Sequence, residues 1–246
     1  MTGDPARPES GERGDDAWPR LAAEDLRALA WLHASERSPR VLAELHANGF
    51  PATLTLVDKD DFWLRCMDRA LAALAGAPHE GEGEALPASS ENDLAADFAA
   101  IYLTHALRAS PCESVWRDED HLMLQAPTFA VRAFYRRHGV QVANWRQRPD
   151  DHLATELEFV ALLLERGELK EAARFLKAHL LVWLPSFANR VGQRAATPFY
   201  AALACLTLAA CEQCLARLPE VAVLPPVVAA DAAPGSAEGC AAGPCG

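Results

Sequence analysis

The stretch RPDDHLATELEFVALLLERG (residues 148–167) decides the fold, because a proline and two aspartates lead directly into a long apolar helix. The apolar residues recur every three to four positions, which places them on one helical face. They are Leu153, Leu157, Val160, Ala161 and Leu164. Similar spacing recurs along the chain, and we see no alternating strand pattern of useful length. The sequence therefore predicts an all-α fold.

The residues before this helix have a simple structural interpretation. Pro149 fixes the chain ahead of the helix, and Asp150 or Asp151 is expected at the N-cap or in the first turn. A carboxylate there accepts backbone N–H bonds and complements the helix dipole. Capping explains the aspartates, but it leaves His152 unexplained.

We expect one compact helical domain over residues 18–218, with roughly eight to ten helices and a loop at about 77–93. Residues 1–17 are rich in Gly, Pro and charge, and residues 219–246 in Ala, Pro and Gly, so both are expected to be flexible tails. Ser90 is expected to cap a helix, with Asp93 three residues on. The expected helical segments are 18 to about 48, 58–76, 94–107, 129–139, 168–185 and 199 to about 218.

The charge balance is acidic, with 34 Asp and Glu against 23 Lys and Arg. An acidic surface repels phosphate backbones and attracts basic peptides, so we expect no nucleic acid as a partner. The polar N-terminal stretch lacks the apolar segment of a signal peptide. The longest uncharged run, Ala195 to Cys211, is short for a membrane span and contains Pro198. We therefore expect a soluble, cytoplasmic protein whose seven cysteines are reduced thiols.

Two kinds of chemistry remain open alternatives to a binding role. His152 and Glu156 share a helix face and could, with Asp151, hold a metal or serve acid–base catalysis. Cys211-x-x-Cys214 could form a metal site with Cys240 and Cys245 in the tail. Neither set completes a known metal signature, and no nucleophile or glycine-rich phosphate loop accompanies them. Most aromatic residues are expected in the core, but Trp116 lies between two prolines, where a large ring can line a groove.

The sequence resembles the TorD/DmsD family of redox-enzyme maturation chaperones. The resemblance rests on PCESVWRDEDHLMLQAPTFAVRAFYRRHGV (111–140), followed by the 148–167 stretch and its P-x-D-H-x-x-x-E-L pattern. Two later segments resemble the family as well, RFLKAHLLVWLPSFANRV (174–191) and ATPFYAALACLTL (196–208). The similarity covers about Leu21 to Leu218, and its first third is generic.

The resemblance implies a chaperone without catalytic activity, cofactor or metal. Such a chaperone binds the twin-arginine leader and the apo catalytic subunit of a molybdoenzyme of the DMSO reductase type, and prevents premature export by the Tat machinery. It leaves the client enzyme open, and a helical adaptor for the mature partner remains an alternative. By motif, the leader-binding groove would include Pro111, Glu113, Ser114, Trp116, Tyr135, Pro149, Asp150, Asp151 and His152.

Charge complementarity suits this interpretation. Glu113, Asp150 and Asp151 could pair with the leader arginines, and an apolar groove could hold its hydrophobic segment. Two residues depart from the family pattern. Arg148 stands where a glutamate is frequent, and is expected to be paired with Glu113 or Asp150. Cys112 stands where an aromatic residue is frequent.

Overall fold

The computed structural model describes residues 17–76 and 89–222. The expected tails and the 77–93 loop lie mainly outside these residues. The described residues form α-helices and two π-helical segments, without a β-strand among them, which confirms the all-α prediction. The elements are α1 (Trp18–Ala34), α2 (Pro39–Ala47), α3 (Phe62–Leu74), α4 (Glu91–Phe98), η1 (Ala99–Leu103), α5 (Glu113–Arg117), α6 (Ala126–Arg137), α7 (Leu153–Glu165), α8 (Leu169–Phe175), η2 (Leu176–Leu180), α9 (Leu181–Arg194) and α10 (Pro198–Arg217).

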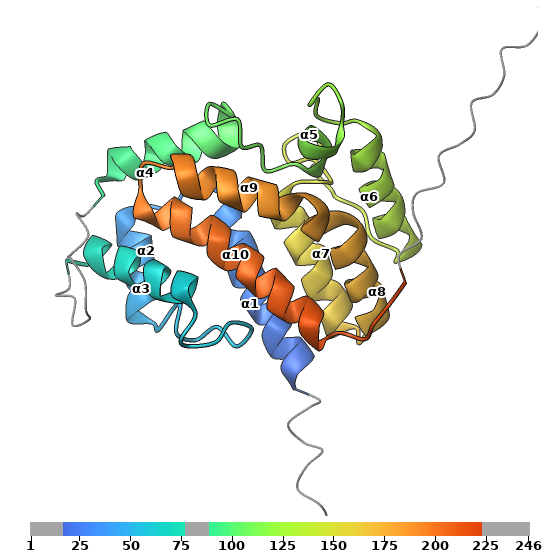
Figure 1. Ribbon diagram of the computed structural model, residues 1–246, viewed down its shortest axis with the longest axis horizontal. Coiled ribbons are helices and arrows are strands. Elements are labelled where there is room, and N and C mark those ends of the chain that lie inside the picture. The colour runs from blue at the N-terminus through green and yellow to red at the C-terminus, as the bar shows by residue number, and fades with distance from the viewer. Residues whose placement is uncertain (1–16, 77–88, 223–246) are drawn as a thin grey trace, which may run out of the picture.

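The helix α7 is the central element of the fold. Its apolar stripe is wider than the sequence predicts, and of its thirteen residues only Glu158 and Glu165 are exposed. A helix that is apolar on nearly all sides must be surrounded by other elements. Accordingly, α1 packs along α7, and α8 and η2 also contact it. Figure 1 shows α7 and α8 side by side on one flank of α10.

The long helix α10 crosses the face of the molecule and packs against α9 and α3 (Figure 1). By length and composition alone it could cross a membrane, but 61% of its most apolar window is buried inside the fold. Its buried residues include Phe199, Tyr200 and Leu203. This burial explains the apolar composition as that of a core helix.

Several helix boundaries differ from the sequence prediction. The segment expected to run to Leu107 ends at Leu103, because His105 adopts a positive φ of 53°, which a right-handed helix cannot include. The segment between Pro111 and Pro127, which includes Trp116, contains the short helix α5. The predicted capping box at Ser90 and Asp93 is confirmed.

Pro185 does not end a helix, contrary to the prediction. The chain continues through it in α9 as far as Arg194. The preceding π-helical segment η2 closes at Leu181, whose ψ of −2° departs from regular helical geometry. In a regular α-helix, the N–H of residue 185 would donate to the Leu181 carbonyl. Proline has no N–H, but the helix is already irregular at Leu181, so little hydrogen bonding is lost there.

Candidate functional site

The two motif segments meet at the start of α5 and α7. Cys112 and His152 form an isolated antiparallel bridge. On either side of it, Glu113 N donates to Asp151 O at 3.0 Å and Leu153 N donates to Pro111 O at 2.7 Å. These backbone bonds fix the loop that precedes α5 against the first residues of α7. Segments almost forty residues apart in the sequence therefore form a single unit, as the resemblance implied.

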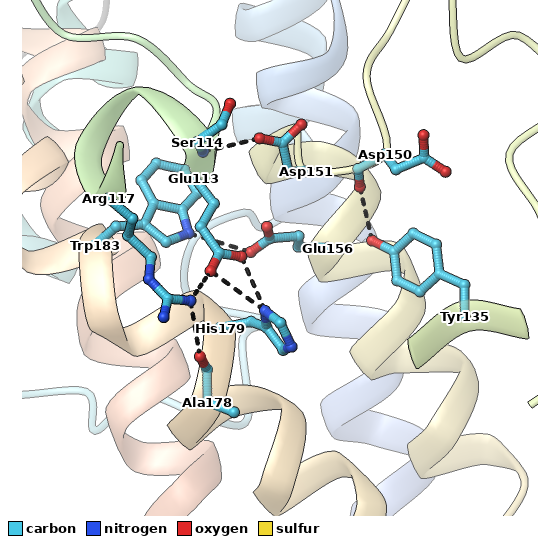
Figure 2. Close-up of polar contacts among 10 residues, drawn as sticks. All are labelled: Glu113, Ser114, Arg117, Tyr135, Asp150, Asp151, Glu156, Ala178, His179 and Trp183. Carbon is cyan, nitrogen blue, oxygen red and sulfur yellow. Dashed lines mark hydrogen bonds and ion pairs between the residues drawn. The ribbon is translucent and has the colours of Figure 1, made fainter. Parts of the chain in front are cut away.

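Asp151 caps a different helix from the one that the sequence predicts. Its Oδ2 accepts the Ser114 N–H at 2.8 Å, so the carboxylate lies at the N-terminus of α5 (Figure 2). Burial raises the pKa of Asp151, and the bond from Ser114 opposes that rise. The N-cap of α7 is His152, whose Nδ1 accepts the Ala154 N–H at 3.1 Å. The capping prediction for Asp150 and Asp151 on α7 is thus wrong, because both side chains bond elsewhere.

Asp150 joins the motif to α6. Its Oδ2 accepts two bonds from Arg132, at 2.7 and 3.1 Å, and its carbonyl accepts the Tyr135 hydroxyl at 2.9 Å. Asp150 and Tyr135 are both buried. Burial raises the pKa of Tyr135 well above its ordinary value, so the phenol stays a hydrogen-bond donor. These contacts hold α6 beside the first residues of α7.

Glu113 lies in a buried polar network under the motif (Figure 2). Its carboxylate pairs with Arg117 and with His179, whose Nδ1 is 3.0 Å from Oε2. The Glu156 carboxyl lies nearby and accepts the Trp183 Nε1–H at 3.3 Å. Burial and the neighbouring negative charge of Glu113 raise the pKa of Glu156 well above its ordinary value. Both causes favour the protonated form of the buried Glu156 carboxyl.

The three carboxylates that were expected to bind the leader arginines already have partners within the protein. Glu113, Asp150 and Asp151 are all buried and already bonded to internal partners. Arg148 was expected to pair with Glu113 or Asp150. Instead it lies 3.8 Å from Glu158 and bonds weakly to the Ala34 carbonyl.

The residues considered as possible metal ligands or catalytic groups also make hydrogen bonds within the fold. His152 caps α7 through Nδ1, and Glu156 is bonded to Trp183. Within the part of the chain that the structure describes, no group of three or more His, Cys, Asp or Glu residues is placed to hold a metal. Cys211 and Cys214 are free, buried thiols, while Cys240 and Cys245 lie outside the described residues.

A large open groove of about 1170 Å³ lies beside the motif. Its lining is mainly apolar and comes mostly from α1, η1, α7 and the 140–149 loop, with single residues from other segments, among them Met123. Four of the expected site residues line it: Pro111, Tyr135, Pro149 and His152. Glu113, Ser114, Asp150 and Asp151 lie behind the wall, where they hold its residues in place. Trp116 is half-buried outside the lining, where its Nε1 donates to Ser110 O and Arg190 lies over its ring.

Sequence reasoning missed the groove wall that α1 and η1 provide. Trp31 and Leu103 line it and are 41% and 65% exposed, although both are large apolar residues. Their exposure is the property that distinguishes them from core residues, and it can be recognised only in the fold. In the sequence they follow the same helical spacing as core residues.

A row of hydrogen bonds lies at the floor of the groove, and the donor and acceptor of each bond can be assigned. Thr207 donates its hydroxyl to Leu203 O at 2.7 Å, so it accepts a bond from His33 Nε2 at 2.9 Å. His33 Nδ1 is then the acceptor for the Tyr102 hydroxyl, at 2.6 Å. Burial, and then the nearby His152, lowers the pKa of His33 to about 3, which keeps the ring neutral. His33 and Tyr102 both line the groove.

The described residues thus form an all-helical domain with a large, mainly apolar groove beside the motif. Residues 66–189 match the family model described as nitrate reductase delta subunit, and the chain belongs to this family, the TorD family. Similar curated proteins include "Chaperone protein TorD" of Vibrio cholerae serotype O1, 36% identical over 49% of this chain and 60% of its own length. "Tat proofreading chaperone DmsD" of Salmonella typhi is 34% identical over 49% of this chain and 61% of its own length. The matched regions thus span about three-fifths of these relatives, and the resemblance is confirmed.

Proposed function

We propose that this protein is a cytoplasmic, non-catalytic chaperone for a molybdopterin-dependent oxidoreductase. It binds the twin-arginine leader and the apo catalytic subunit of that enzyme, assists cofactor insertion and delays export by the Tat machinery. The proposal is supported by membership of a family whose similar members are named as chaperones. The structural observation that carries it is the apolar groove beside the P-D-D-H motif.

The size and lining of the groove favour a peptide as its occupant. Small-molecule pockets enclose about 300–1,000 Å³, and this groove, at about 1170 Å³, is larger and open. Trp31, Leu103 and Met123 are partly exposed along it. Covering these side chains with the hydrophobic segment of a leader would remove apolar surface from water, which favours binding.

Under this proposal the expected site residues act in two ways. Pro111, Tyr135, Pro149 and His152 line the groove and contact the leader. Glu113, Ser114, Asp150, Asp151 and Trp116 set the positions of those walls through their internal bonds. The second group therefore controls affinity indirectly, by holding the groove in a binding-competent shape.

The test is calorimetric titration of the full chain with a twin-arginine leader peptide, using the variant Leu103→Asp. Leu103 lines the groove and is largely exposed, so a charge there blocks an apolar ligand without entering the core. Val182→Asp is the matched control, since Val182 is 49% exposed on α9 and outside the groove lining. We expect Leu103→Asp to weaken binding by about tenfold or more, and Val182→Asp to change it less than about twofold.

Two outcomes would contradict the proposal. One is a wild-type chain that binds no leader. The other is equal weakening by both substitutions, which would remove the groove from the binding event. Binding of an apo-enzyme that survives removal of its leader would instead favour the adaptor alternative.

A further inference from the structure

The groove lining lacks a free carboxylate for a basic peptide. Among its lining residues, the charged carboxylate is Glu158, which lies 3.8 Å from Arg148. Arg27 also lines the groove and is held by Glu165 through Nη2 at 2.7 Å. The buried carboxylates behind the wall are bonded internally. To a ligand with two arginines the lining thus offers one carboxylate, Glu158, which already lies beside Arg148.

The loop between α5 and α6 offers unpaired carboxylates. Glu119 and Asp120 are exposed, and neither makes an ion pair or a side-chain hydrogen bond within residues 17–76 and 89–222. The next three large side chains, Leu122, Met123 and Leu124, are 53%, 37% and 41% exposed. This segment (residues 118–124), here called the acidic–apolar loop, presents two unpaired carboxylates, then His121, and then three partly exposed apolar side chains.

Internal bonds hold the loop in this arrangement. Asp118 Oδ2 accepts the Leu122 N–H at 3.1 Å, and the His121 ring bonds to Val115 O at 2.8 Å. His121 and Leu124 adopt positive φ values of 56° and 61°, which turn the chain sharply at both residues. Because local bonds fix the loop, its carboxylates and apolar groups are presented together.

The loop is continuous with the groove through Met123, which belongs to the groove lining. Deeper in the groove, His152 is nine-tenths buried, and its Nδ1 is used by Ala154. The neutral ring therefore carries its proton on Nε2, which has no partner in the described part of the chain. This N–H lies in the groove lining, where it can donate a hydrogen bond to a ligand that supplies an acceptor, such as a peptide carbonyl.

We propose that the acidic–apolar loop binds the arginine pair of the leader and thereby determines the direction in which the leader lies in the groove. The arginines lie against Glu119 and Asp120, and the following hydrophobic segment passes Leu122, Met123 and Leu124 into the groove, towards His152. The order of charge and hydrophobicity along the loop thus matches the order along the peptide. This inference rests on the proposed function and assigns the arginine-binding residues within it.

The charges of the groove itself support this direction. Its lining contains Arg27 and Arg148, so a leader entering with its arginines deep in the groove would meet like charge. With the arginines at the loop, the uncharged part of the leader lies beside these two residues. The opposite orientation would bury a cationic segment against apolar walls without a free carboxylate.

The test compares two double variants that remove the same charge from the full chain. Glu119→Gln with Asp120→Asn neutralises the loop, and Asp58→Asn with Asp60→Asn neutralises two exposed aspartates before α3. Leader binding is measured with the twin-arginine peptide and with a peptide of the same composition in which the arginines follow the apolar segment. We expect the loop variant to weaken the first peptide by about three- to tenfold, as for two exposed ion pairs. The control should change it less than about twofold, and wild type should prefer the first peptide.

The outcomes separate this inference from the proposed function. If the leader binds and Leu103→Asp weakens it, but the loop variant matches its control, the loop assignment is wrong and the groove stands. Equal affinity of wild type for the two peptide orders would overturn the direction. If wild type binds neither peptide, both proposals fail together.

Discussion

Asp150, Asp151 and His152 are neighbours in the chain, yet their side chains bond to three different helices. Asp150 pairs with Arg132 of α6, Asp151 accepts the first free N–H of α5, and His152 caps α7. The motif therefore sets the relative positions of these helices. A substitution in it alters the groove walls even where the side chain never contacts the ligand.

Glu156 provides a prediction about stability. Its raised pKa means that the native state keeps a proton that the unfolded chain releases above about 4.5, so Glu156 lowers stability as the pH rises. Glu156→Gln keeps an acceptor for Trp183 and removes the ionisation. We expect this variant to be more stable than wild type near pH 8, with the difference shrinking as the pH falls towards 4.5. Urea unfolding at several pH values measures it.

Glu158→Gln is the matched control, because Glu158 is on the same helix but exposed. It should leave the pH dependence of unfolding nearly unchanged. A Glu156→Gln variant that follows the wild-type pH dependence would show that Glu156 is ionised in the native state.

At the scale of the elements, Asp151 connects α5 to α7, and its substitution tests that role. Asp151→Asn keeps an oxygen for the Ser114 N–H and avoids placing a charge in a buried site. Asp151→Ala leaves that N–H without its partner, which costs about 1–3 kcal/mol. We expect Asp151→Ala to unfold at lower urea concentration than Asp151→Asn, and to weaken leader binding with it. Equal stability of the two variants would indicate that the capping bond contributes little.

Helix identity could be predicted from the sequence, but helix ends and caps could not. Periodic apolar residues predicted α7 and α10 because a long stripe must be buried. The prediction that the helix ends at Pro185 was wrong, because the usual rule for proline does not take into account the π-helical segment η2 that precedes it. His152 replaced the aspartates as a cap because contacts with Arg132 and Ser114, distant in sequence, held their carboxylates.

At the scale of the whole molecule, the motifs predicted which two segments meet, but not the groove that they border. Pro111 and His152 came from recognisable motifs and do line it. Trp31 and Leu103 come from segments with generic helical spacing, and only the packing of α1 against α7 places Trp31 at the surface beside the motif. The free carboxylates of the acidic–apolar loop could be distinguished from the buried ones only by their exposure.

The buried histidines of the groove predict how the stability of the whole molecule responds to acid. Burial is the largest cause that lowers the pKa of both His33 and His152, from 6.5 to about 3. The unfolded chain binds these protons below about 6.5 while the native state does not, so stability falls as the pH drops from 6.5 towards 3. Each ring contributes a slope of up to about 1.4 kcal/mol per pH unit. Glu156 has the opposite effect, because it lowers stability as the pH rises above about 4.5.

The two histidines lower stability as the pH falls below about 6.5, whereas the buried carboxyls of Glu156, Asp25 and Asp151, whose pKa values burial raises, lower it as the pH rises. Urea unfolding from about pH 4 to 8 measures the sum of these opposing effects. Nitrogen NMR of the imidazole rings provides the specific measurement: His33 and His152 should both remain neutral, with the proton on Nε2, down to about pH 5. Titration of either ring near 6.5 would show that water reaches it, and that the groove floor is more open than its hydrogen bonds indicate.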